Sequence, residues 1–181
     1  MRSMPLRLSA TVALALATAA PLSAQQPAPE PAPAPNCPAD AQPIPTPLAA
    51  WNDEAGEAGA ADAAGAARQP LTPGTPVTLA LMPTDRVTMA VTPGRAAQPG
   101  RHAGLAAITV PTAGTYRFAL GAGAWIDVVR DGRAVTSAAH GHGPACSGIR
   151  KIVDFALTPG LYVVQISDSP VASVRLLMAA P

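Results

Sequence analysis

The stretch Ile152-Val153-Asp154-Phe155-Ala156-Leu157-Thr158-Pro159-Gly160-Leu161-Tyr162-Val163-Val164-Gln165-Ile166 decides the fold. Apolar side chains occupy every second position on both sides of a central turn: Val153, Phe155 and Leu157 before it, and Tyr162, Val164 and Ile166 after it. Alternation of this kind predicts strands with one buried face, and Pro159-Gly160 is typical of a turn. Ile149 is expected to begin the first apolar face, which Lys151 interrupts.

The same pattern extends from Gln69 to the end of the chain. Nine short runs between turn signals are expected to be strands: 77–82, 86–91, 104–110, 115–120, 125–130, 133–136, 149–157, 161–167 and 172–178. They predict an all-β fold, an antiparallel β-sandwich that is jelly-roll-like. The expected core contains the six apolar residues of the opening stretch together with Tyr116, Phe118, Leu120, Val174, Leu176 and Met178.

Two kinds of turn are expected within the sandwich. Asp131-Gly132 is typical of a two-residue hairpin turn, because such turns favour positive φ at both positions. Gly114 and Gly160 each precede a tyrosine by two residues, which predicts the same corner at Tyr116 and at Tyr162.

Composition divides the chain before the sandwich into three parts. Residues 1–24 combine two arginines, a short apolar run and small residues before Gln25, which is typical of a signal peptide cut after Ala24. Residues 25–47 are expected to be a disordered proline- and alanine-rich linker. Residues 48–68 are expected to be a flexible alanine- and glycine-rich segment, and residues 69–181 the β-sandwich domain.

Charge and hydropathy exclude two classes of partner. The apolar run of the leader is shorter than the roughly 20 residues of a spanning helix, so no membrane span is expected. The 12 Lys and Arg side chains, two of them in the leader, balance 11 Asp and Glu, with no basic cluster for nucleic acid. We expect a periplasmic or secreted protein.

The two cysteines, Cys37 and Cys146, predict one disulfide, because an exported protein meets an oxidising compartment. Such a bond would attach the N-terminal arm to the sandwich. The alternative is two free thiols, with Cys146 serving as a metal ligand.

The run His140-Gly141-His142-Gly143-Pro144-Ala145-Cys146-Ser147-Gly148-Ile149-Arg150-Lys151 concentrates the uncommon residue types of the chain. In an extended segment both imidazoles would lie on one side, and with the Cys146 thiolate they suit zinc or copper. Asp127 and His102 are the remaining candidate ligands. The alternative is a glycine-rich loop with exposed or locally hydrogen-bonded histidines and no cofactor.

Catalysis is not the favoured interpretation of this run. Cys146 with a histidine base has suitable residue types, but a nucleophile also needs an orienting group and an oxyanion site. Ser147 lacks the Gly-x-Ser-x-Gly motif. We therefore expect no enzyme active site.

A polar and aromatic patch is the other candidate site. Trp125 and Asp127 share one face of their strand, and Arg150 and Lys151 follow the histidine run, so these four residues would form a ligand patch on the sandwich. Alternatively, Trp125 covers a sheet edge and Asp127 pairs with an arginine such as Arg150. Lys151 either reaches the rim or neighbours Asp127.

Three segments, 113–120, 125–132 and 152–166, resemble the β-sandwich domains of secreted bacterial peptidases known as pre-peptidase C-terminal domains. The likeness spans about the last seventy residues and is a pattern of corners and strands. It implies a jelly-roll-like fold and a role in binding carbohydrate or protein. The acidic cluster of their calcium-binding relatives is absent here.

The histidine run is also similar to that of short exported chains labelled homogentisate 1,2-dioxygenase. That enzyme family is cupin-type and holds iron with two histidines and a glutamate, but no glutamate follows His140 and His142. The residues do not support that chemistry.

We expect an exported, envelope-associated binding or structural module with an envelope protein or a saccharide as partner. The alternative is a small periplasmic metal-binding protein, with oxygenase chemistry as a remote extension.

Overall fold

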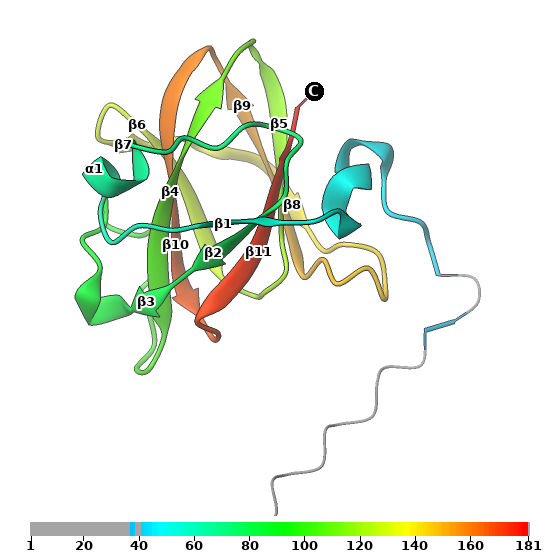
Figure 1. Ribbon diagram of the computed structural model, residues 1–181, viewed down its shortest axis with the longest axis horizontal. Coiled ribbons are helices and arrows are strands. Elements are labelled where there is room, and N and C mark those ends of the chain that lie inside the picture. The colour runs from blue at the N-terminus through cyan, green and yellow to red at the C-terminus, as the bar shows by residue number, and fades with distance from the viewer. Residues whose placement is uncertain (1–36, 39–40, 181) are drawn as a thin grey trace, which may run out of the picture. The chain divides into compact units, whose positions relative to one another are not determined.

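A computed structural model describes residues 37–38 and 41–180 and arranges them around two facing β-sheets (Figure 1). The first sheet has the strand order β1 (Gly56–Ala58), β2 (Val77–Ala80), β11 (Ser173–Ala179), β5 (Gly114–Leu120), β9 (Lys151–Leu157), β8 (Ser137–Gly141). The second has the order β3 (Met82–Pro83), β4 (His102–Val110), β10 (Gly160–Ser169), β6 (Trp125–Arg130), β7 (Arg133–Ala134). The expected all-β sandwich is confirmed.

The chain passes repeatedly between the two sheets, so strands that pair are mostly distant in sequence. The order β2-β11-β5-β9 faces the order β4-β10-β6-β7, and this interleaving is jelly-roll-like. Every pairing between these named strands is antiparallel except that of β1 with β2.

The core between the sheets follows the alternation of the sequence. All of the expected core residues except Ile149 belong to one buried cluster, in which the rings of Phe118 and Phe155 meet edge to face with centroids 5.5 Å apart. Ile149 is buried, but it precedes β9 and packs with Leu48 and Trp51 instead. The expectation that Ile149 starts the core face was wrong because the chain enters β9 only at Lys151.

An N-terminal arm covers the outer face of the first sheet. Its 3₁₀ segment η1 (Thr46–Asn52) buries Leu48 and Trp51 against Ala119 and Leu177. The Trp51 indole N–H donates to the Ser147 carbonyl at 2.9 Å. The expected disulfide between Cys37 and Cys146 is confirmed, with Cα atoms 5.7 Å apart.

The outer face of the second sheet is covered as well. Residues 48–68, predicted to be a flexible segment, contain most of η1, all of β1 and the single helical turn α1 (Ala63–Ala66), which Asp62 caps through the Gly65 amide. The expectation of a strand at residues 86–91 was wrong: Arg86 ends the 3₁₀ turn η2 (Thr84–Arg86), and residues 87–91 follow it without pairing in either sheet. Val87 and Met89 instead pack with α1 on the apolar outer face of β4, which propensity alone does not reveal.

The expected turns are present. Asp131 and Gly132 have φ values of 50° and 72° and join β6 to β7 as a two-residue turn. At both expected corners a tyrosine hydroxyl donates to a carbonyl four residues earlier: Tyr116 to Thr112 at 2.9 Å and Tyr162 to Thr158 at 3.0 Å.

The predicted signal peptide and most of the predicted linker lie outside the described residues. No helix in the described part of the chain is long and apolar enough to cross a membrane.

Candidate functional site

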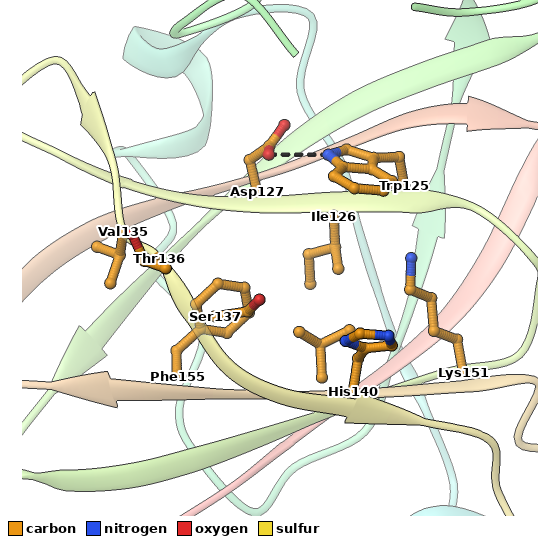
Figure 2. Close-up of a pocket in the computed structure, with 10 residues that line it drawn as sticks. Trp125, Ile126, Asp127, Val135, Thr136, Ser137, His140, Lys151 and Phe155 are labelled. Atoms are coloured by element: carbon orange, nitrogen blue, oxygen red, sulfur yellow. Dashed lines mark hydrogen bonds between the residues drawn. The ribbon is translucent and has the colours of Figure 1, made fainter. Parts of the chain in front are cut away.

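A pocket of about 330 Å³ opens where the chain crosses from the second sheet to the first. It lies between β6 on one side and β8 and β9 on the other, with Val135 and Thr136 of the crossing segment at one end (Figure 2). Its apolar floor is formed by Ile126, Val153 and Phe155, which all belong to the sandwich core. Its polar rim is formed by Trp125, Ser137, His140 and Lys151.

The hollow exists because the two edge strands do not close the sandwich. In β8, Ser137 pairs with Phe155 and His140 pairs with Val153, so these two polar side chains share the inner face of the sheet. Opposite them, β7 is only two residues long. Neither strand supplies a large apolar side chain to cover the floor.

Lys151 projects into the space between the sheets. It pairs with Leu120 and lies two residues before Val153, so it has the parity of the core. Its Nζ donates to the Ala124 carbonyl at 3.1 Å and lies 4.8 Å from the centre of the Trp125 ring. Burial lowers the Lys151 pKa from its ordinary value, the charge of Arg95 lowers it further, and Asp127 opposes them.

Asp127 is a structural carboxylate on the other side of β6 from Ile126 (Figure 2). Its Oδ1 accepts from the Trp125 indole at 2.8 Å, and its Oδ2 accepts from Gln165 Nε2 at 3.0 Å and from the Gly94 amide at 3.3 Å. The suggested pairing of Asp127 with Arg150 is therefore wrong. Asp127 instead fastens the segment around Gly94 to the second sheet.

The four residues of the expected ligand patch are divided between two places. Trp125, Asp127 and Lys151 line the pocket described above, and His140 joins them. Arg150 lines a different hollow together with His142, Cys37 and Cys146. The structure thus brings Trp125, Asp127 and Lys151 together and places Arg150 apart from them.

The expected metal ligands are not assembled. Cys146 is bonded to Cys37, both Asp127 oxygens accept hydrogen bonds, and the Nδ1 of His142 lies 3.0 Å from the Arg150 carbonyl. Within residues 37–38 and 41–180, no group of three His, Cys, Asp or Glu side chains is placed to hold a metal ion. His102, the other candidate ligand, begins β4 and has a buried Nδ1 without a hydrogen-bond partner.

Other buried polar residues were not identified from the sequence. Gln165 lies between two core residues and accepts from the Ala90 amide at 3.1 Å, and Asp168 accepts from the Gln98 amide at 3.0 Å. Asp168 also pairs with Arg95 at 3.2 Å. These side chains hold the segment before β4 against the second sheet. No local pattern marks them because their partners lie about seventy residues away.

Comparisons with protein-family models, with curated proteins and with solved structures find no match.

Proposed function

We propose that this chain is an exported, envelope-associated binding module without catalytic activity of its own, and that it takes a small ligand into the pocket between β6, β8 and β9. The observation that carries the proposal is the combination of an apolar floor with a half-buried cation at the rim. Binding sites are typically concave, mostly apolar and equipped with a few polar groups that orient the ligand.

The rest of the sandwich supports this assignment. The arm covers the outer face of the first sheet, and α1 with residues 87–90 covers the second. Both coverings bury apolar surface of the chain itself. At the pocket, core side chains instead line an open hollow.

Export is supported by the leader pattern of residues 1–24 and by the Cys37–Cys146 disulfide, because such bonds persist in oxidising compartments. Expression of the full chain in a bacterial host, followed by fractionation and thiol labelling, tests this part. The protein is expected in the periplasm or the medium with both cysteines unreactive. Cytoplasmic protein with reactive thiols would contradict export.

The binding role is tested by titrating the exported, oxidised protein with a set of small neutral, anionic and cationic organic molecules. Amide and indole N–H signals are followed by two-dimensional NMR. Trp125 lines the pocket, whereas Trp51 lies in the cluster under the arm. The Trp51 indole signal is therefore an internal control. Binding is expected to shift the Trp125 indole signal and amides of β6, β8 and β9. A set in which no molecule shifts them would contradict the proposal.

A further inference from the structure

Lys151 lacks an anionic partner in a place where one is expected. None of the ion pairs in the described part of the chain involves Lys151. Its Nζ has the Ala124 carbonyl and the face of the Trp125 ring as neighbours, and an ammonium group has more N–H donors than these contacts use. Lys151 is half-buried, so its ammonium group keeps N–H donors that face the pocket and that a ligand acceptor can use.

The nearest candidate inside the protein is already engaged. Asp127 contributes to the field at Lys151, but its two oxygens accept hydrogen bonds from Trp125, Gln165 and Gly94. Turning Asp127 toward Lys151 would break a buried network and leave Gln165 Nε2 with only the Val91 carbonyl. Among the described residues, no acidic side chain therefore competes for Lys151 with an anionic ligand that enters the pocket.

The shape of the pocket selects the rest of the ligand. Below the ammonium the surface is the hydrocarbon of Ile126, Val153 and Phe155, and Figure 2 shows Lys151 rising beside this floor toward Trp125. A volume of about 330 Å³ is at the small end of the range for ligand sites. A compact anion with a short apolar body matches both features.

The rim favours a carboxylate over a phosphate group. Phosphate recognition usually involves several cations or a bidentate arginine, whereas the pocket has one ammonium, with the His140 imidazole also on the rim. We propose that the pocket binds small amphipathic monocarboxylates, whose carboxylate pairs with Lys151 and whose hydrocarbon part covers Ile126, Val153 and Phe155. This inference rests on the proposed binding function and names its ligand class.

The test compares three probes of equal chain length: hexanoate, hexan-1-ol and hexylammonium. Titration near pH 7, where the carboxylate is ionised, follows the Trp125 indole signal. Hexanoate is expected to bind roughly ten- to a hundredfold more tightly than hexan-1-ol, the range of a charge-assisted hydrogen bond. Hexylammonium is expected not to bind. Equal affinity for hexanoate and hexan-1-ol would overturn the inference and leave the binding function standing.

Two variants assign the effect to Lys151. Lys151→Met keeps a long unbranched side chain and removes the charge, so the preference for hexanoate is expected to disappear. Arg150→Met removes the neighbouring cation, which lines a different hollow, and is expected to keep the preference. A preference that survives in Lys151→Met, judged folded from its amide spectrum, would overturn the inference. If no hexyl probe binds but another small molecule shifts the Trp125 signal, the inference fails while the binding function holds.

Discussion

The ammonium group of Lys151 lies 4.8 Å from the centre of the Trp125 ring, and it is on the face of β9 that carries the sandwich core. A lysine in this position loses hydration, which a cation–π contact and one carbonyl only partly replace. The described structure thus holds a charge in a site that an apolar side chain would otherwise fill.

This placement makes the stability of the protein depend on pH. Burial and Arg95 lower the Lys151 pKa below the ordinary value of 10.5, although Asp127 opposes them. Between the lowered pKa and 10.5 the unfolded chain binds more protons at this site, so the free energy of unfolding rises with pH there. Relative to Lys151→Met, the natural protein is expected to gain stability as the pH approaches 10.5.

Urea unfolding of both proteins near neutral pH and about pH 10 measures this difference. A stability difference that stays constant over this range, or moves against the natural protein, would contradict the assignment.

The disulfide is expected to be a large source of stability. Cys37 and Cys146 are separated by 109 residues, and closing a loop of this length constrains the unfolded chain by about 4 to 5 kcal/mol in the chain-entropy model. The double variant Cys37→Ser, Cys146→Ser should lower the free energy of unfolding by about 2 to 5 kcal/mol. Urea unfolding in oxidising buffer measures the loss. Reductant should lower the stability of the natural protein only, and an equal effect on the variant would point to another cause.

Asp127 should stabilise the second sheet through its hydrogen bonds. Asp127→Asn turns one carboxylate oxygen into a donor that faces the N–H group of Trp125, Gln165 or Gly94. The free energy of unfolding is expected to fall by about 1.5 to 3 kcal/mol, as for other hydrogen bonds to charged groups. Asp131→Asn is the matched control, because Asp131 is exposed and asparagine tolerates its positive φ of 50°. Equal unfolding midpoints for the two variants would refute this role.

Gly143 is expected to be required for the shape of the loop between β8 and β9. A Cβ atom at this position would lie 2.4 Å from the Cβ of Ile149, which is anchored in the cluster under the arm. Gly143→Ala should therefore destabilise the protein by about 1 to 3 kcal/mol, as for other cases of overpacking. Gly141→Ala, two residues earlier, meets no atom within 4 Å and is the control. Thermal unfolding should separate the two variants, and coincident melting curves would show that the contact does not matter.

Most of the fold could be predicted from the sequence because its signals are local. Alternation placed Val153, Phe155 and Tyr162 in the core. Asp131-Gly132 marked a two-residue turn, because that turn requires positive φ at both positions. The repeated spacing from glycine to tyrosine marked both corners. The disulfide was predicted because the sequence has only two cysteines and a leader pattern typical of exported proteins.

The misplaced elements were those whose environment is decided by tertiary packing rather than by the alternation of neighbouring residues. Ile149 has an apolar side chain in either environment, and only the position of Leu48 and Trp51 decides that it faces the arm. Residues 86–91 have strand-like composition, but α1 and the outer face of β4 hold them without pairing. Neither relationship leaves a local pattern in the sequence.

For the candidate site, too, local sequence patterns gave one part of the answer and long-range packing gave the other. The sequence by itself determined that Lys151 interrupts an apolar face, because strand parity is a property of neighbouring residues. Only the tertiary structure decided that Trp125 and His140 meet it at one pocket while His142, Cys146 and Arg150 lie elsewhere. The reason is physical: β6, β8 and β9 come together through packing between two sheets, and such long-range contacts depend on the whole core rather than on any single segment.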